Sequence, residues 1–372
     1  MRFAFLLAVW VLVTGCAVSP EKADNLPGAI NSILTRHHTF SGVVLIAEQG
    51  IPAYHRAFGY RDSENQLLND TATIFEFASV SKQFTSMIIL MLQEEGKLSF
   101  DDPLDKYLSG LPYPGITVRH LLTHTSGLPD YQAIMDEHWD KTKVAGNEDI
   151  LEYLKKYHPP KLFEPGEKYE YSNTGYVLLG SIAEVVSGKD FIALCRERIF
   201  KPVGMNATEI RTLEEKAKTD NFARGYVFVE EKGRYVAADS FPSSNYIVWL
   251  GNRKGPGRVS GKASDLLRWD RALYAHTLVK DETLEAAFTP YRLNNDSLSH
   301  YGFGWMIDQH PTLGRKIWHT GSNPGYSTRI VRFIDADKTI IVLSNNAYPK
   351  IKELDQALDS LLGTRVKSLV QP

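Results

Sequence analysis

Segments with the pattern of β-strands lie at both ends of the chain, whereas its middle has the pattern of helices. Near the N-terminus, the apolar run GVVLIAE at residues 42–48 is followed by Gln49-Gly50 and a second β-rich run. Four more short β-rich runs lie near the C-terminus, at residues 302–307, 316–319, 326–334 and 338–344. Strands so far apart in sequence share a sheet only when the chain folds back on itself. We therefore expect one antiparallel sheet built from both ends.

The middle of the chain, from residue 79 to about residue 275, has helical periodicity in most of its segments, with long loops between them. This distribution predicts an α+β protein with a single domain over residues 26–365. A cleft between a sheet lobe and a helical lobe is a natural place for a functional site. The predicted lobes are a sheet lobe from 26–78 and 276–365 and a helical lobe from 79–275.

The first residues have the pattern of an export signal. A basic residue is followed by an apolar run at residues 3–13, which is too short to span a bilayer, since a spanning helix needs about 20 residues. We predict a signal peptide at residues 1–15 and a polar tether at 16–25. The motif VTGC resembles the end of a bacterial lipobox, so Cys16 is predicted to be lipidated and to anchor the exported protein to a membrane. The alternative is cleavage after Ala17, which leaves a soluble protein.

Composition and motifs exclude several kinds of partner. The 372 residues carry a formal net charge of −2, so nothing points to nucleic acid. His120 and His124 are four residues apart, but Leu121 stands where the zinc signature His-Glu-x-x-His has glutamate. No glycine-rich loop follows a strand in the dinucleotide-binding pattern. We therefore expect no metal and no cofactor, and we expect a small-molecule or peptide substrate, while the oligomeric state stays open.

The motif Ser79-Val80-Ser81-Lys82 opens a helix that is apolar on nearly all sides, so the helix is expected to be buried. Three residues make close to one helical turn, so Ser79 and Lys82 lie on one face. A helix N-terminus favours negative charge, and a buried lysine amine can lose its proton and act as a base. This combination predicts Ser79 as a nucleophile that Lys82 activates.

A Ser-x-x-Lys motif alone is a weak signal, because roughly one match is expected by chance in a chain this long. Ser19-Pro20-Glu21-Lys22 is such a match, but its proline and its lack of apolar periodicity argue against a site there. The alternative for Ser79 is an N-cap serine followed by a surface lysine. That alternative explains poorly why Lys82 lies on so apolar a helix.

A second motif, Tyr171-Ser172-Asn173, precedes a helix expected to begin near Thr174. A phenol near an ammonium group can pass protons, and an amide can hold both a lysine amine and a substrate amide. Taken alone, the segment is better explained as a turn before a helix, with Tyr171 as a core aromatic residue.

A third motif, His319-Thr320-Gly321-Ser322, comes at the end of a predicted strand. A glycine in an edge strand lets a substrate backbone approach closely. The Thr320 hydroxyl can donate to a substrate carboxylate, and the N–H of Ser322 can point into an oxyanion hole. The alternative is a strand end followed by a Gly-Ser-Asn-Pro-Gly turn.

The three motifs, in this order and context, resemble those of the serine β-lactamases and penicillin-recognising peptidases. The pattern Ser-x-x-Lys, Tyr-x-Asn and Lys- or His-Thr-Gly is most similar to class C β-lactamases, to D-alanyl-D-alanine carboxypeptidases that resemble them, and to related esterases. The resemblance covers roughly residues 26–362. Three further stretches look like this family: HLLTHTSGLP at 120–129, FKPVGM at 200–205 and SDLLRW at 264–269.

The resemblance implies a fold and a role for each matched residue. The fold is the β-lactamase-like (DD-peptidase) fold, an antiparallel five-stranded sheet flanked by helices plus a mostly helical lobe. Ser79 would attack the carbonyl, and Lys82 and Tyr171 would share the general-base and general-acid work. The N–H groups of Ser79 and Ser322 would form the oxyanion hole. The residues implied in substrate binding are Asn173, His319, Thr320, Gly321 and Ser322.

The implied activity is that of an exported serine hydrolase of the periplasm or cell envelope, working through an acyl-enzyme. A carboxypeptidase, peptidase or esterase on small amide or ester substrates is the preferred interpretation. Two alternatives stay open: a β-lactamase proper, and a non-catalytic protein that binds penicillin or cell-wall peptide. A pure binder has no need for a buried lysine beside the serine.

His319 stands where class C β-lactamases have lysine. Because histidine is only partly protonated near neutral pH, it would offer a weaker and pH-dependent field for a substrate carboxylate. We therefore expect turnover to change between about pH 5.5 and 8 beyond the effects of Lys82 and Tyr171. No glutamate is placed like the deacylating base of class A enzymes, since Glu164 precedes Tyr171, so rapid β-lactam turnover is not indicated.

Overall fold

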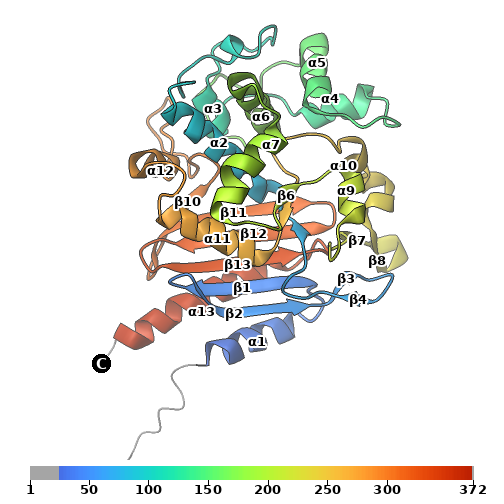
Figure 1. Ribbon diagram of the computed structural model, residues 1–372, viewed down its shortest axis with the longest axis vertical. Helices are drawn as coiled ribbons and strands as arrows, with labels where there is room; N and C mark the ends of the chain where they lie inside the picture. The colour runs from blue at the N-terminus through green and yellow to red at the C-terminus, as the bar shows by residue number, and fades with distance from the viewer. Residues whose placement is uncertain (1–24, 371–372) are drawn as a thin grey trace, which may run out of the picture.

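One antiparallel sheet, built from the two ends of the chain, forms the lower part of the molecule in the computed structural model, which describes residues 25–370 (Figure 1). Its strand order is β10-β11-β12-β13-β1-β2, with every neighbouring pair antiparallel. The six strands are β1 (Gly42–Glu48), β2 (Ile51–Phe58), β10 (Met306–His310), β11 (Gly314–Asn323), β12 (Tyr326–Phe333) and β13 (Lys338–Ser344).

Strands β1 and β13 join the two chain ends at the middle of the sheet. Their register places Leu45 opposite Ile341 and Ile46 opposite Ile340. Both strands are buried on both faces, as their continuous apolar runs predict. Tight turns connect the hairpins, and Gly50 supplies the left-handed backbone (φ 75°) that the β1–β2 turn needs.

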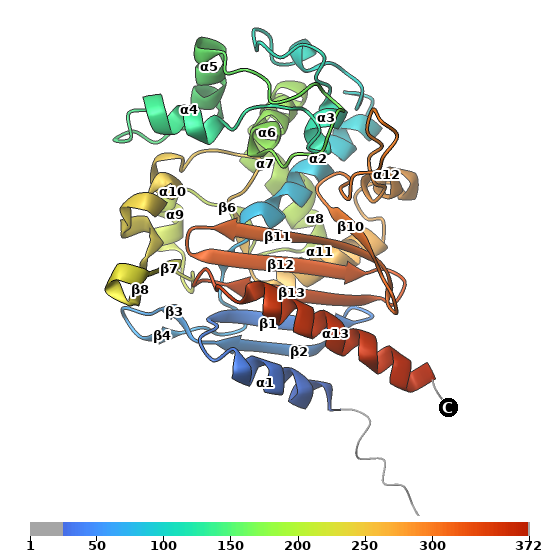
Figure 2. The same ribbon diagram turned by 180° about the vertical axis from the view of Figure 1, so that it is seen from behind.

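Helices cover both faces of this sheet. On one face, α1 (Leu26–Arg36) and α13 (Ile351–Val370) pack on each other and on the side chains of Val44 and Val342 (Figure 2). On the opposite face, α11 (Ala263–Tyr274) packs against β13 and β1. Its Asp270 pairs with Arg332 of β12 at 2.6 Å, and both side chains are buried. Successive side chains of a strand point to opposite faces of the sheet, so strands such as β1 and β13 contribute apolar side chains to the cores on both faces.

A mostly helical lobe sits above the sheet and is formed by the middle of the chain (Figure 1). Helix α2 lies in the centre of this lobe and packs against α6 and α7. The helices are α2 (Lys82–Glu94), α3 (Val118–Leu122), α4 (Tyr131–His138), α5 (Asn147–Tyr157), α6 (Asn173–Ser187) and α7 (Phe191–Cys195). Shorter helices connect the lobe to the sheet: α8 (Lys201–Val203), α9 (Leu213–Lys218), α10 (Tyr246–Trp249) and α12 (Asp281–Ala287).

Three small sheets tie the loops together where the two parts of the molecule meet. Strand β9 (Val259–Gly261) pairs with β5 (Phe75–Glu76) on one side and with β6 (Glu209–Ile210) on the other. The remaining pairs are β3 (Tyr60–Asp62) with β4 (Leu67–Leu68), and β7 (Tyr226–Val229) with β8 (Arg234–Ala237). Strand β5 leads directly into the segment that carries Ser79, so this small sheet fixes where that serine lies.

The predicted fold class is confirmed, with two differences in detail. The large sheet has six strands where the resemblance implied five. The residue pattern itself marked six β-rich segments, two near the N-terminus and four near the C-terminus. Helix α11 lies against the sheet although its residues were expected in the helical lobe. The predicted signal peptide and tether lie almost wholly outside the described residues.

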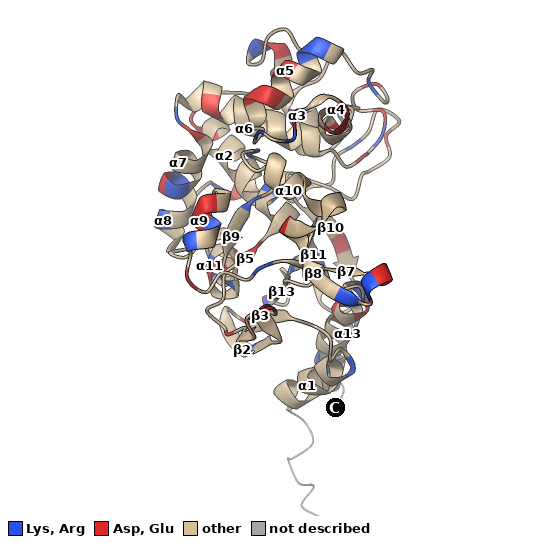
Figure 3. Ribbon diagram, turned by 90° about the vertical axis from the view of Figure 1, so that its right-hand side faces the viewer, with Lys and Arg blue, Asp and Glu red and all other residues tan. Residues whose placement is uncertain are grey.

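Charged residues are mixed in sign over the surface. Helices α5 and α9 each carry acidic residues in the first turn and basic residues in the last turn (Figure 3). Among the residues that the structure describes, no helix has the length and apolar character needed to cross a membrane.

Candidate active site

Ser79 lies in a tight turn of backbone between β5 and α2. The turn is a 3₁₀ segment, Ala78–Ser81, that runs into α2 at Lys82. Ala78 has a left-handed backbone (φ 48°), which is a strained conformation for a residue with a Cβ. Neighbouring segments hold the turn in place: the Phe77 N–H donates to Val259 at 2.8 Å, and the Thr328 hydroxyl donates to the Phe77 carbonyl at 2.7 Å. Contacts from both β9 and β12 therefore fix the position of the turn that carries the serine.

Strand β11 passes directly against this turn, and Gly321 makes the approach possible. A Cβ at Gly321 would lie 2.2 Å from the Thr328 hydroxyl oxygen and 2.4 Å from the Phe77 carbonyl oxygen. No side chain fits in that space. Sequence analysis assigned this glycine to the approach of a substrate backbone. The structure gives a different reason, which is the packing of the third motif against the segment that bears Ser79.

The amine of Lys82 is the point where three segments of the chain meet. Its Nζ lies 3.2 Å from Ser79 Oγ, 2.8 Å from Asn173 Oδ1 and 2.9 Å from the carbonyl oxygen of Pro256. The side chain is fully buried. No carboxylate pairs with it among the described residues. The first and second predicted motifs are thus brought together, and the Pro256 carbonyl is a partner that sequence analysis missed.

Burial and a nearby positive charge both disfavour protonation of Lys82. Desolvation is the larger cause, and the charge of Arg253 adds to it, so the pKa of Lys82 is well below its ordinary value of 10.5. A neutral amine has two hydrogens and one lone pair. The two carbonyl oxygens of Asn173 and Pro256 can accept the hydrogens, which leaves the lone pair for the Ser79 hydroxyl.

Tyr171 lies beside the amine on the face that is open to solvent. The Lys82 Nζ is 4.7 Å from the centre of the Tyr171 ring, and the side chain is 37% exposed. Burial of the phenol raises the pKa of Tyr171 far above its ordinary value, and the neighbouring Ser79 hydroxyl only partly opposes that rise. The phenol therefore keeps its proton at neutral pH.

Asn173 is positioned by the start of helix α6. Ser172 caps the helix, since its hydroxyl accepts from the Gly175 N–H at 3.2 Å. The Ser172 N–H in turn donates to His124 Nδ1 at 3.1 Å. His124 is buried and its ring lies 4.3 Å from that of Tyr171. His124, the second histidine of the stretch HLLTHTSGLP, thus helps to fix the backbone of the second motif at Ser172.

His319 does not face the substrate side of the site. Its ring is 1% exposed, with Nε2 at 2.9 Å from the Tyr301 hydroxyl and Nδ1 at 2.6 Å from the Thr320 carbonyl oxygen. The carbonyl requires a proton on Nδ1, so Nε2 accepts from Tyr301. Burial lowers the pKa of His319 to about 3.

The expected change in turnover between about pH 5.5 and 8 through His319 is therefore wrong, because the imidazole stays neutral over that whole range. The assignment of His319 to substrate binding needs the same correction, since both ring nitrogens already have partners within the protein. Sequence gives the residue type but not its burial, and burial decides its charge.

The other residues of the third motif lie toward the solvent. Thr320 is half-buried, and its hydroxyl has no hydrogen-bond partner among the described residues. Ser322 is exposed, and Asn323, which follows it, donates from its amide to Glu76 at 2.5 Å. Thr320 and Ser322 are thus accessible from the solvent side, and their role in substrate binding stays a prediction.

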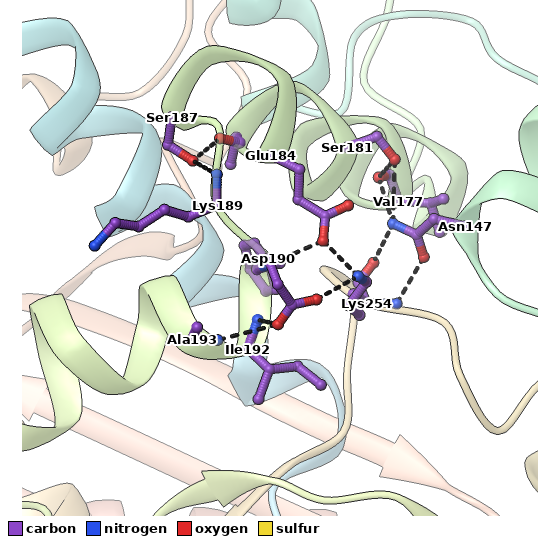
Figure 4. Close-up of polar contacts among 12 residues, drawn as sticks. Asn147, Val177, Ser181, Glu184, Ser187, Lys189, Asp190, Ile192, Ala193 and Lys254 are labelled. Atoms are coloured by element: carbon purple, nitrogen blue, oxygen red, sulfur yellow. Dashed lines mark hydrogen bonds and ion pairs between the residues drawn. The ribbon is translucent and has the colours of Figure 1, made fainter.

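The loop that carries Pro256 is fixed by a polar network around Asn147 and Lys254 (Figure 4). Asn147 accepts from the Lys254 N–H at 2.7 Å and donates to the Lys254 carbonyl at 3.1 Å. The Lys254 ammonium pairs with Glu184 of α6 and with Asp190 at 3.0 Å. These contacts hold the loop to helices α5 and α6. They thereby position the Pro256 carbonyl oxygen next to the Lys82 amine.

Comparison with known proteins shows the family of the chain. Residues 26–363 match the family described as Beta-lactamase. The chain belongs to the β-lactamase family. It is 44% identical over 314 residues to a penicillin-binding protein of Bacillus subtilis (strain 168), covering 84% of this chain and 69% of that protein. This β-lactamase-family protein is a serine hydrolase by that membership, as the resemblance implied.

Two further relatives extend the comparison. A D-aminopeptidase of Brucella anthropi is 27% identical over 308 residues, covering 82% of this chain and 55% of that protein. The crystal structure of a penicillin binding protein from Bacillus halodurans matches with a TM-score of 0.76 and 28% identity, covering 89% of this chain and 98% of the other.

The close contact at Gly321 predicts that Gly321→Ala damages the site. Overpacking costs roughly 1–3 kcal/mol of unfolding free energy, and displacing a nucleophile by about 1 Å can slow a reaction about 100-fold. We expect both losses, measured by urea unfolding and by the rate at which a fluorophosphonate labels Ser79. The matched control is Gly146→Ala, because a Cβ there meets nothing closer than 3.7 Å. Equal losses in both variants would contradict the packing argument.

The burial of His319 predicts that its ring does not titrate near neutral pH. Histidine-labelled protein, with the signal assigned through His319→Gln, should show a neutral imidazole from pH 8 down to pH 5 by nuclear magnetic resonance. In the unfolded chain the same ring takes up a proton below about pH 6.5, so acidification through this range should reduce stability. A midpoint between pH 5.5 and 8 would restore the original expectation.

Proposed function

We propose that Ser79 is the nucleophile of a hydrolase that forms an acyl-enzyme on small amide or ester substrates, as a carboxypeptidase, peptidase or esterase does. One observation carries the proposal. A buried lysine amine, which has no counter-ion among the residues that the structure describes, lies 3.2 Å from the Ser79 hydroxyl and is oriented by two carbonyl oxygens. A serine followed by a surface lysine would have neither the burial nor the two acceptors.

The first step of the proposed reaction is proton transfer from Ser79 to the neutral Lys82 amine while Oγ bonds to the substrate carbonyl carbon. The protonated lysine then has three hydrogens for the three acceptors around it. The negative charge on the former carbonyl oxygen would be met by the N–H groups of Ser79 and Ser322. Asn173 and Thr320 would hold the substrate's amide and carboxylate.

The second step is collapse of the tetrahedral intermediate with departure of the amine or alcohol. The leaving group needs a proton, and the Tyr171 phenol can supply it, because the phenol keeps its proton and lies beside Lys82. Lys82 returns a proton to Tyr171, which restores the neutral amine. Water then attacks the ester of Ser79 by the same route, and the acid product leaves.

The substrate class follows from the relatives. The named relatives include a penicillin-binding protein and a D-aminopeptidase. We infer substrates in which the acylating residue has the D-configuration, such as peptides ending in two D-residues. Hydrolysis of β-lactams themselves is the second candidate, since a β-lactam presents the same amide to the same serine.

Acylation of Ser79 is testable by intact-protein mass spectrometry with a fluorophosphonate and with a penicillin. Wild-type protein should gain one adduct, Ser79→Ala should gain none, and Lys82→Met should react about 10²- to 10⁴-fold more slowly, as loss of a general base predicts. Ser19→Ala, in the other Ser-x-x-Lys match, is the control and should behave as wild type.

The absence of any adduct on the wild-type protein would contradict the proposal and favour a non-catalytic binder. A panel of p-nitrophenyl esters, nitrocefin, D-alanyl-D-alanine peptides and D-amino-acid amides then ranks the substrate classes. Turnover of nitrocefin above that of the peptides would favour the β-lactamase alternative.

We propose further that the protein is exported and that Cys16 is lipidated after removal of residues 1–15. The support is the apolar run followed by VTGC. When the full chain is produced in bacteria, the protein should partition into the detergent phase, and Cys16→Ser should move it to the aqueous phase. Cys195→Ser is the control, because that thiol is buried in the folded domain. A mature N-terminus at Val18 would instead show cleavage after Ala17.

A further inference from the structure

A cavity of about 420 Å³ lies beside the site, and none of the proposed catalytic groups lines it. Segments that flank the site form its walls. Glu76 comes three residues before Ser79, Asn323 comes directly after Ser322, and Arg253 and Arg258 lie on either side of Pro256. The cavity is large enough for an amino-acid side chain or a short acyl group.

Arg253 lines this cavity with a buried cation that forms no ion pair and no hydrogen bond within the described part of the chain. The residue is only 9% exposed, and its Nε is buried without a hydrogen-bond partner. Among the described residues no carboxylate forms an ion pair with its guanidinium and no carbonyl accepts from it, although the charge of Glu76 is near enough to interact. The ring of Tyr246 lies 5.9 Å away, measured from Cζ to the ring centre. Burying an unpaired charge is unfavourable unless something compensates for it.

The carboxylates of the cavity are already neutralised by other residues. Glu76 pairs with Lys216 and accepts from Asn323. Asp239 pairs with Arg224 at 2.9 Å. Arg258 is a second cation on the wall, 6% exposed, whose guanidinium donates to the carbonyl of Arg211 and forms no ion pair among the described residues. The cavity lining therefore contains four cationic and two carboxylate side chains, which is an excess of two positive charges.

The position of the cavity along β11 indicates which part of a substrate reaches it. The strand runs from Thr320 through Ser322 to Asn323. A substrate whose carbonyl lies between Ser79 and Ser322, and whose leaving group lies toward Thr320 and Tyr171, sends its acyl part toward Asn323. A separate and smaller cavity of about 190 Å³ borders Tyr171 and Asn173 on the other side.

We propose that the larger cavity binds a carboxylate on the acyl part of the substrate, with Arg253 as the residue that recognises it. The assignment rests on the proposed acylation of Ser79. A carboxylate site at this position would favour N-acylated peptides that carry an acidic group before the scissile bond. It disfavours D-amino-acid amides with a free ammonium group at that position, because the cations of the cavity repel a positive charge.

The geometry of the loop supports a binding role. Lys254 is fixed on both sides by Asn147 and by the ion pairs with Glu184 and Asp190, so Arg253 next to it is held in place before a ligand arrives (Figure 4). A pre-positioned guanidinium loses little freedom when it binds, and its planar fork matches a carboxylate.

The test uses two substrates that differ by one carboxymethyl group, N-succinyl-D-alanine p-nitroanilide and N-acetyl-D-alanine p-nitroanilide. Wild-type protein should prefer the succinyl compound by roughly 10- to 100-fold in kcat/KM, the range expected for a hydrogen bond between charged groups. Methyl succinyl-D-alanine p-nitroanilide, which has the same length without the charge, should lose that preference.

Arg253→Gln should bring the ratio of the two kcat/KM values close to one, and Arg253→Lys should restore part of it. The ratio is the readout because Arg253 also affects Lys82, which would change both rates together. Arg119→Gln is the matched control, since that arginine pairs with Asp101 far from the cavity. An unchanged ratio in Arg253→Gln, or no preference in the wild type, would overturn the proposal.

Binding to Ser79→Ala separates this inference from the proposed function. Calorimetry with N-succinyl-D-alanine amide and N-acetyl-D-alanine amide should show tighter binding of the succinyl compound, and Ser79→Ala with Arg253→Gln should lose the difference. Labelling of Ser79 without selective binding of the succinyl compound would contradict the proposed carboxylate site but not the proposed hydrolase. Selective binding of the succinyl compound without any labelling of Ser79 would contradict the proposed hydrolase and still support the carboxylate site.

Discussion

The amine of Lys82 is the interaction on which the rest of the site depends. It touches three parts of the chain that are far apart in sequence, through Ser79, Asn173 and Pro256. Each partner is itself fixed: the serine by a strained turn, the asparagine by the capped start of α6, and the proline by the network around Lys254. A buried amine tolerates few arrangements of its neighbours, because each hydrogen needs an acceptor where water cannot supply one. The helix α2, buried on all sides, brings the amine into this position and isolates it from solvent.

The large sheet contributes to the site through one strand. Strand β11 passes so close to the Ser79 turn that only glycine fits at position 321, and Thr328 of β12 binds the Phe77 carbonyl on the same face. The Ser79 turn therefore packs directly against the sheet, and helix α2 of the helical lobe supplies the lysine from the other side. Because β1 and β13 join the two chain ends in the middle of that sheet, the site is complete only when the whole chain has folded. This explains why a nucleophile at residue 79 can depend on a motif near residue 320.

Much of this arrangement could be predicted from the sequence, and the missing parts have a common cause. Periodicity identified the two-ended sheet, the buried helix α2 and the helix expected near Thr174, which begins at Asn173, since side-chain spacing is a local property. The Pro256 carbonyl, the support of Ser172 by His124, and the unpaired Arg253 were not predicted, because backbone groups carry no sequence signal and pairing depends on tertiary contacts. His319 shows the same limit. Its residue type suggested a titrating group near neutral pH, but its burial and its bonds to Tyr301 and Thr320 keep it neutral.

The charges around the site then form one electrostatic system. With His319 neutral, the positive charge near the serine comes from Arg253 and Arg258, on the acyl side of β11 rather than at its leaving-group end. In the free protein, the charge of Arg253 helps to keep Lys82 unprotonated. A carboxylate bound at Arg253 would cancel much of that charge, and the pKa of Lys82 would rise toward its ordinary value. The amine would then take the proton of Ser79 more readily, at the moment when a substrate lies over it. Recognition of an acidic acyl group and activation of the nucleophile would thus be coupled through a single arginine, without any movement of the backbone.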